Sequence, residues 1–234
     1  MPTSQHIPSL LGAAPNCDFC DEFSGGVVNS FFRLYGNTLN SRIIASSSHF
    51  NIIPTIGQIV EGYLLIVPKA HHRALADLPP DLLDELAYIV NAIHSAILAR
   101  YGTYIMFEHG TRGQSSGGCG VMHAHMHVLP FAATNDPIDV VKGNYPCKTI
   151  ESVDQMSEAT TRSSYLFYQD TSSNRYIFQT DYLPSQYVRQ LLARALSSEA
   201  WDWRAAEQEP RLVTTITCFS SLLKTSVDRV KHGS

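Results

Sequence analysis

Long apolar runs and a strong charge of either sign are both missing from this sequence. No uninterrupted apolar run approaches the roughly eighteen residues that span a bilayer, so we expect a soluble protein without a membrane partner. The net charge is only -4 over 234 residues, without the basic face that a nucleic-acid polymer normally requires. Hydrophobic residues make up 44% and charged residues 16% of the chain, a globular composition that argues against global disorder.

A secretory signal is missing as well. Residues 1–14 lack a basic segment followed by an apolar core, which is the pattern of a signal peptide. The cysteines form an odd set, which does not suit a complete disulfide framework: Cys17, Cys20, Cys119, Cys147 and Cys218. We therefore expect reduced thiols and a cytoplasmic location.

The apolar patterns predict an α+β fold with a mainly antiparallel sheet and one long helix. Apolar residues at helical spacing predict that helix between Asp81 and Tyr101. The glycine-rich segment Glu108–Gly120 predicts a loop. Stretches rich in β-forming residues predict strands at Ser30–Tyr35, Arg42–Ser46, His49–Pro54, Tyr63–Val67, Thr103–Phe107 and Val121–Leu129.

The pattern changes after Pro130. The polar segment Thr134–Glu158 predicts a loop, and a helix is expected from Pro184 to about Leu196. Ser164–Gln169 and Arg175–Thr180 predict a hairpin. A hairpin and one helix are too small to bury their own apolar faces. We therefore predict a first domain at residues 1–133 and a C-terminal α/β extension at residues 134–234 that packs on it.

Three histidines alternate with apolar residues in the strand predicted at Val121–Leu129. His123, His125 and His127 would share one face of that strand, with Ala124 and its alternating neighbours on the other. Imidazoles are poor core material, because each needs hydrogen-bond partners for a donor and an acceptor. They suit a site that handles phosphate, a metal or a proton near neutral pH. The glycine-rich loop just before them is able to present backbone amides to an anion.

These features together resemble the histidine-triad (HIT) superfamily of nucleotide hydrolases and nucleotidyltransferases. The resemblance covers about residues 17–131, from Gly62-Tyr-Leu-Leu-Ile-Val-Pro-Lys-Ala-His71 through a helix and a glycine-rich loop to His-Ala-His-Met-His-Val-Leu. The spacing from Gly118-Cys119 to His123 is also similar to the hexose-phosphate uridylyltransferase and diadenosine-polyphosphate phosphorylase branches. The resemblance implies a HIT-like fold, a small nucleotide substrate and a homodimer.

The resemblance also implies a covalent mechanism. His125 would attack the α-phosphorus of a nucleotide to form a nucleotidyl-imidazole, and His127 would bind the phosphate or assist the leaving group. The family usually has a serine where this chain has Gly120, and an acidic ribose-binding residue where it has Thr55. The residues expected to contact the substrate are Gly118, Cys119, Gly120, Thr55, His109 and Arg112.

Hydrolysis is the expected reaction of this site, with three alternatives left open. One is transfer of the nucleotidyl group to a phosphate acceptor, as in a nucleotidyltransferase or phosphorylase. Another is a non-catalytic nucleotide-binding regulatory protein. The third is a hydrolase that uses zinc-bound water, which would need an open position on the metal.

Cys17 and Cys20 have the Cys-x-x-Cys spacing of half a tetrahedral zinc site. The spacing alone fits two free thiols equally well. The resemblance implies the other half, because zinc-binding relatives use the histidines that correspond to His71 and His123. We therefore expect one structural Zn2+ on these four residues, with His72 as an alternative to His71.

Overall fold

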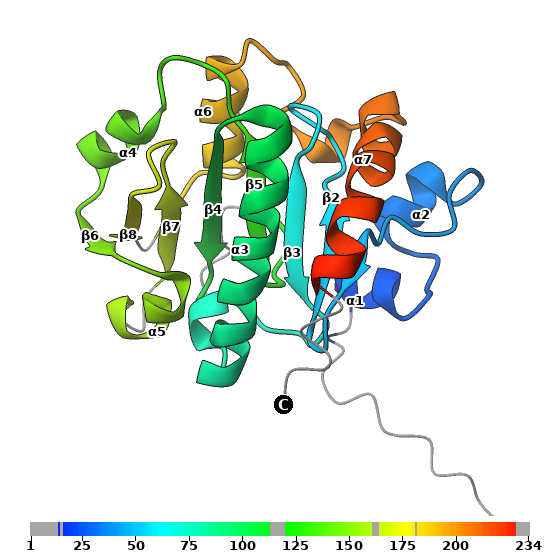
Figure 1. The fold of residues 1–234 in the computed structure, drawn as a ribbon, viewed down its shortest axis with the longest axis horizontal. Coiled ribbons are helices and arrows are strands. Elements are labelled where there is room, and N and C mark those ends of the chain that lie inside the picture. The colour runs from blue at the N-terminus through cyan, green and yellow to red at the C-terminus, as the bar shows by residue number, and fades with distance from the viewer. Residues whose placement is uncertain (1–13, 15, 113–119, 161–163, 181, 228–234) are drawn as a thin grey trace, which may run out of the picture.

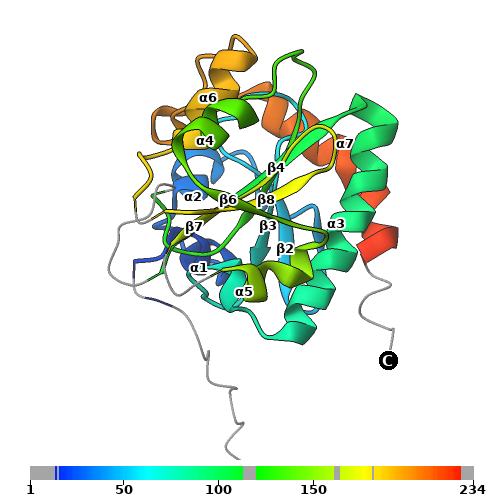
Figure 2. The same cartoon turned by 90° about the vertical axis from the view of Figure 1, so that its left-hand side faces the viewer.

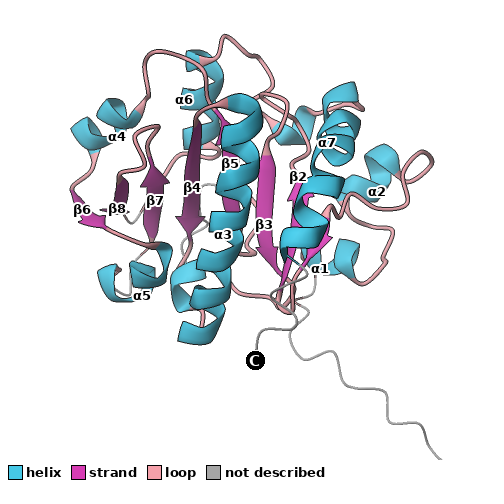
Figure 3. Ribbon diagram, viewed as in Figure 1, coloured by secondary structure: helices cyan, strands magenta, loops and turns pink. Residues whose placement is uncertain are grey.

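The computed structural model describes residues 14, 16–112, 120–160, 164–180 and 182–227, with side chains up to residue 223. Its centre is an eight-stranded sheet in the order β1-β2-β3-β5-β4-β7-β8-β6, in which neighbouring strands are antiparallel (Figures 1 and 3). The strands are β1 (Ala45–Ser46), β2 (Phe50–Pro54), β3 (Leu64–Pro68), β4 (Tyr104–Gly110), β5 (Met126–Pro130), β6 (Cys147–Ile150), β7 (Tyr165–Gln169) and β8 (Arg175–Gln179). The predicted α+β class is confirmed.

Helices cover both faces of the sheet. Figure 2 shows α3 (Pro80–Tyr101) and α7 (Pro210–Val227) on one side. The opposite face packs against α1 (Asp18–Phe23), α4 (Ile138–Asn144) and α6 (Tyr187–Ala195). The remaining short elements are α2 (Ser30–Tyr35), α5 (Met156–Ala159) and three 3-10 turns at Leu75–Asp77, Val153–Gln155 and Trp203–Ala205.

The long helix α3 forms where the apolar spacing predicts it. Pro80 stands in its first turn, where the missing N–H costs no hydrogen bond, and Gly102 ends it at a φ of +83°. Among the described helices, α3 alone is long and apolar enough by length and composition to cross a membrane. Its apolar stripe packs on the sheet instead, through Leu83, Leu86, Ile89, Val90, Ile93 and Ile97.

The strand predicted at Ser30–Tyr35 is wrong, because these residues form the helix α2. The side chain of Asn29 accepts a hydrogen bond from the amide of Phe32 at 2.7 Å, which caps a helix start. Phe31 and Tyr35, four residues apart, then stack with ring centres 5.7 Å apart. The local cap outweighs the β propensity of the aromatic residues.

Three further boundaries differ from the sequence-based expectations. β4 continues to Gly110, into the segment predicted as loop, and Arg42–Ser46 forms a strand only at Ala45–Ser46. The predicted loop Thr134–Glu158 contains α4, β6 and α5. The hairpin β7–β8 forms as predicted and joins the sheet through β4, which pairs with β7 from Met106 to Gly110. The domain boundary after Ala133 stays a prediction.

The strand β5 lies near the middle of the sheet and its side chains alternate between the two cores. Met126 and Val128 point to the α3 side, whereas Leu129 points to the α6 side. Ala124, just before the strand, also joins the α3 side. The histidines between these apolar residues therefore lie towards the face that α1 and α6 cover.

Candidate active site and metal centre

His127 is held in β5 between its two neighbouring strands. It lies opposite Leu65 of β3 and Phe107 of β4, and its ring stacks on the Phe107 ring with centres 4.1 Å apart. The hydroxyl of Tyr63 meets its Nδ1 at 2.8 Å. These contacts fix the ring plane, and the residue is only 4% exposed.

His125 lies just before β5 and is oriented by a backbone carbonyl. Its Nδ1 is 2.6 Å from the carbonyl oxygen of His123. A carbonyl oxygen only accepts, so Nδ1 carries the proton and Nε2 keeps its lone pair. The rings of His125 and His127 lie 4.6 Å apart. The arrangement leaves one neutral nitrogen nucleophile beside a second imidazole.

The prediction that all three histidines lie in one strand is wrong for His123 and His125. The ladder begins only at Met126, because the preceding backbone bonds elsewhere: the amide of Ala124 donates to the carbonyl of His72 at 2.7 Å. The expected alternation of faces still holds, since Ala124 is buried on the α3 side. The segment is extended without being paired.

A small cavity of about 40 Å³ opens in front of His125 and His127. Two of the predicted ligand residues, His109 and Thr55, also line it. The sequence analysis missed the rest of its wall, which consists of Asp18, Phe19, Arg42, Ile56, Leu65, Val121, Gln186, Arg189 and Trp203. The last three come from the C-terminal region, and no spacing in the sequence connects them to the histidines.

Burial keeps the imidazoles of the cavity neutral. It lowers the pKa of His125 to about 4, with Arg189 and Arg42 lowering it further, and that of His109 to about 3, with the neighbouring imidazole of His125 as the second cause. The pKa of His127 is also well below its ordinary value for the same reason. At neutral pH the cavity therefore presents uncharged imidazoles.

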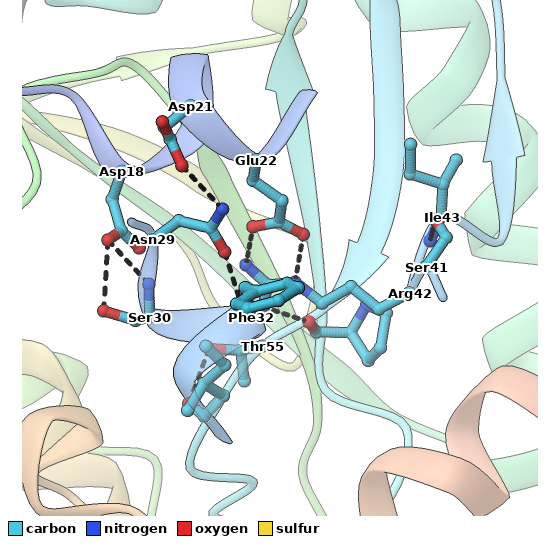
Figure 4. A network of polar contacts seen from close by, with 12 residues as sticks. Asp18, Asp21, Glu22, Asn29, Ser30, Phe32, Ser41, Arg42, Ile43 and Thr55 are labelled. Carbon is cyan, nitrogen blue, oxygen red and sulfur yellow. Dashed lines mark hydrogen bonds and ion pairs between the residues drawn. The ribbon is translucent and has the colours of Figure 1, made fainter. Parts of the chain in front are cut away.

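The opposite wall is fixed by polar contacts between α1, α2 and the segment before β1 (Figure 4). The carboxylate of Glu22 accepts from Nε and Nη2 of Arg42 at 2.8 and 2.7 Å. Asp18 accepts from the amide and hydroxyl of Ser30 at 2.9 and 3.1 Å. Thr55 donates its hydroxyl to the carbonyl of Ile56 at 3.0 Å, so that hydroxyl is already used.

Cys17, Cys20, His71 and His123 come together beside this cavity. Their four ligand atoms all lie within 4.8 Å of one another. The Nδ1 of His123 is 3.3 Å from Sγ of Cys17 and 3.6 Å from Sγ of Cys20, and the Nδ1 of His71 is 3.5 Å from Sγ of Cys20. Zn–S and Zn–N bonds at a tetrahedral angle place S and N about 3.6 Å apart. The cluster has the dimensions of a tetrahedral Cys2His2 site.

The orientation of His123 fits metal binding as well. Its Nε2 is 2.8 Å from the carbonyl oxygen of Pro68, so Nε2–H donates there and the lone pair is on Nδ1, which faces the thiols. The cluster contains His71, not His72. No coordination position is left for water once four side chains bind, which disfavours zinc-bound water as the nucleophile.

Among the described residues, the predicted ligand residues Arg112 and Gly120 do not belong to the cavity wall. Arg112 pairs with Asp77 at 2.5 Å and bonds Thr160 at 3.0 Å, outside the cavity. Gly118 and Cys119 lie outside the described residues. Gly120 has a φ of +78°, and a Cβ there would lie 1.7 Å from Nη2 of Arg204. The C-terminal region therefore occupies the space of a side chain at position 120.

Comparison with known proteins finds a similarity for part of the chain. Residues 37–133 match the HIT domain family. Two uncharacterised HIT-like proteins from Mycobacterium tuberculosis strains CDC 1551 and H37Rv are each 32% identical over 91 residues, or 38% of this chain and 60% of theirs. The chain thus spans about 60% of the length of these relatives.

Several solved structures are also similar to this chain. A HIT family protein from Bacillus anthracis is 25% identical, with a TM-score of 0.40 over 53% of this chain and 79% of that one. A zinc-bound histidine triad family protein from Mycobacterium smegmatis is 22% identical, with a TM-score of 0.37 over 52% and 78%. A hypothetical histidine triad nucleotide-binding protein from Sulfolobus tokodaii is 16% identical, with a TM-score of 0.42 over 92% and 94%.

Proposed function

We propose that the protein is a nucleotidyl hydrolase that cleaves a nucleoside α-phosphate linkage through a nucleotidyl-histidine intermediate. Suitable substrates are dinucleoside polyphosphates, nucleoside phosphoramidates and related compounds. The observation that carries this proposal is the lone pair on Nε2 of His125, because Nδ1–H donates to the His123 carbonyl at 2.6 Å. An oriented, neutral imidazole beside a cavity is a nucleophile that needs no prior deprotonation.

In the first step, Nε2 of His125 forms a bond to the α-phosphorus while the bond to the leaving group breaks. The leaving atom takes the bonding pair and is protonated by water. Tyr63 donates to Nδ1 of His127 in this assignment, so Nε2–H of His127 donates a hydrogen bond to the negative charge that develops on the leaving atom. In the second step, water attacks the phosphorus and loses a proton to solvent, and the P–N bond breaks with its electron pair returning to Nε2 of His125.

We also propose that Cys17, Cys20, His71 and His123 bind one structural zinc ion. The S–N separations of 3.3 to 3.6 Å and the inward-facing Nδ1 of His123 support this assignment. When bound, zinc would link the start of α1 to the segment before β5 and would supply no chemistry to the reaction. Elemental analysis of Cys17→Ser tests the site: zinc is expected to disappear, and unchanged zinc would refute it.

The decisive test of the function compares the wild type with His125→Asn on three substrate classes: dinucleoside polyphosphates, nucleoside phosphoramidates and nucleotide sugars. We expect turnover of at least one class by the wild type and none by the variant. Equal behaviour on all three would refute the enzymatic proposal, and tight binding without turnover would indicate a regulatory nucleotide-binding protein.

Transfer to a phosphate acceptor differs from hydrolysis only in what attacks the intermediate. Product analysis with and without added inorganic phosphate distinguishes hydrolysis from transfer. Hydrolysis yields the nucleoside monophosphate whether or not phosphate is added. The homodimer, the lack of nucleic-acid and membrane partners, and the cytoplasmic location stay predictions. Light scattering in solution tests the dimer.

A further inference from the structure

Arg189 extends from α6 into the cavity that His125 and His127 line. It is 3% exposed, so its guanidinium is well shielded from solvent. The guanidinium carbon lies 5.3 Å from the centre of the Tyr63 ring, and the hydroxyl of that tyrosine contacts His127. Arg189 therefore lines the same cavity as His125 and His127, although its helix α6 belongs to the C-terminal region (Figure 1).

Backbone carbonyls hold this guanidinium in place. Nε donates to the carbonyl of Trp201 at 2.7 Å, and Nη2 donates to those of Gly57 and Ala200 at 2.7 and 3.0 Å. The approach is close, because a Cβ on Gly57 would lie 3.2 Å from Nη2 and 3.1 Å from Cα of Trp203. Nη1 is buried and has no hydrogen-bond partner among the described residues. One donor group of a fixed, buried cation is thus unused.

Arg42 also lines the cavity, and its charge is neutralised by an ion pair. It is also buried, but Glu22 accepts from its Nε and Nη2, and the carbonyl of Pro54 accepts from Nη1 at 2.8 Å. Within the described part of the chain, Arg189 makes no ion pair with a carboxylate. A buried charge without a counter-ion is costly, which favours an anion as the missing partner.

The cavity has the size of one phosphate group. A volume of about 40 Å³ holds roughly three water-sized groups, enough for the two non-bridging oxygens of an esterified α-phosphorus. The carboxylate in the wall, Asp18, accepts at Oδ1 from the amide and hydroxyl of Ser30.

We infer that Arg189 binds the phosphate that His125 attacks, with Nη1 donating to an ionised non-bridging oxygen. The inference rests on the proposed function and adds that the C-terminal region completes the active site. Guanidinium groups suit phosphate oxygens in geometry and charge. The substrate is therefore an anionic phosphate ester or anhydride whose reacting phosphorus lies between Arg189 and the triad.

The test measures binding of inorganic phosphate by calorimetry to the zinc-loaded full chain. Arg189→Gln is expected to weaken binding by at least about 10-fold, as for loss of a charge-assisted hydrogen bond, and Arg189→Lys by less. Arg194→Gln, an equal change of charge at an exposed position of the same helix, is the matched control and should stay within about twofold. Zinc content, which should not change, checks the fold of each variant.

A wild-type measurement covers the case in which Arg189→Gln fails to fold. The guanidinium nitrogen signal of Arg189 is the NMR signal that is present in the wild type and missing from Arg189→Lys. Phosphate added to the wild type should shift this signal, and an unshifted signal would refute the inference. Equal phosphate affinity of Arg189→Gln and wild type would refute it too. Neither result affects the proposed function, which fails separately if His125→Asn turns over substrate like the wild type. An Arg189-dependent phosphate site in a chain without turnover would support a binding role.

Discussion

The two imidazole sites of this protein are neighbours and are built in opposite ways. In the Cys2His2 cluster, four ligand atoms converge within 4.8 Å and face one another. Around His125 and His127, the rings line a cavity that they share with two arginines. Convergent ligands suit a cation, whereas separated donors around a space suit an anion. In the proposed function, identical side chains would therefore serve metal binding in one site and phosphate chemistry in the other, according to what each ring faces.

One residue belongs to both sites. His123 directs Nδ1 towards the thiols, and its backbone carbonyl accepts from Nδ1 of His125 at 2.6 Å. Whatever fixes the His123 ring thus also fixes the carbonyl that orients the nucleophile. We therefore expect a substitution in one site to affect mainly that site, with a smaller but measurable effect on the other site.

The largest effect is expected from His125→Asn. Loss of the nucleophile should reduce turnover by on the order of 10³-fold or more, with zinc content and melting temperature close to wild type. His49→Asn, at an exposed histidine paired with Glu85, is the control and should retain activity. Steady-state kinetics measures the effect. A loss of zinc in His125→Asn would contradict the division between the two sites.

Next in size is Cys20→Ser, which removes a cluster ligand. Because metal binding contributes to folding, we expect lost zinc and a melting temperature lower by roughly 5–10 °C. Turnover should fall by about 10-fold through the His123 carbonyl. Cys147→Ser, at an exposed cysteine, should change neither. Full activity in a zinc-free Cys20→Ser protein would show that the sites are uncoupled.

A smaller effect is expected from Tyr63→Phe, which removes the hydroxyl 2.8 Å from Nδ1 of His127. The loss of one buried hydrogen bond, about 1 kcal/mol, corresponds to a turnover lower by roughly 5- to 10-fold. Zinc content should be unchanged, because the hydroxyl contacts His127, which is not one of the four cluster residues. Wild-type turnover would contradict the role proposed for His127 at the leaving group.

The smallest effect should come from Phe19→Leu, and it should appear in both sites. The Phe19 ring meets the edges of His123 and His125 with centres 5.6 and 5.4 Å apart. A volume-conserving change there costs about 1 kcal/mol. We expect a melting temperature lower by roughly 2–4 °C and turnover lower by about twofold. If calorimetry and kinetics show a change only in the melting temperature or only in turnover, Phe19 is not a shared contact of the two sites.

The sequence predicts the sheet and the metal cluster better than it predicts the cavity. Period-two and helical patterns locate β2, β3, α3 and the β7–β8 hairpin because each depends on local spacing. Cys-x-x-Cys and the histidine motif, read with the family resemblance, bring together four residues that the structure places in one cluster. Periodicity misses α2, because one asparagine cap decides its conformation.

The wall of the cavity could not be predicted for a different reason. Arg189 lines the cavity because the C-terminal region folds back onto Gly57, whose carbonyl accepts from Nη2 of Arg189. No local sequence pattern predicts this contact. Arg112 is expected near the phosphate because it lies in the glycine-rich segment and guanidinium suits phosphate geometry, but the nearby carboxylate of Asp77 pairs with it instead. The position of a residue beside a sequence motif is therefore a poor guide to its role where tertiary contacts supply the charges around it.

The central claim is that His125 carries the nucleotidyl group. Wild-type protein mixed with an α-³²P-labelled substrate of the class it turns over, and quenched within milliseconds in alkaline denaturant, tests it most directly. The claim predicts acid-labile label on the peptide that contains His125 and no protein-bound label in His125→Asn. Product formation without any protein-bound label, or equal label in His125→Asn, would contradict it.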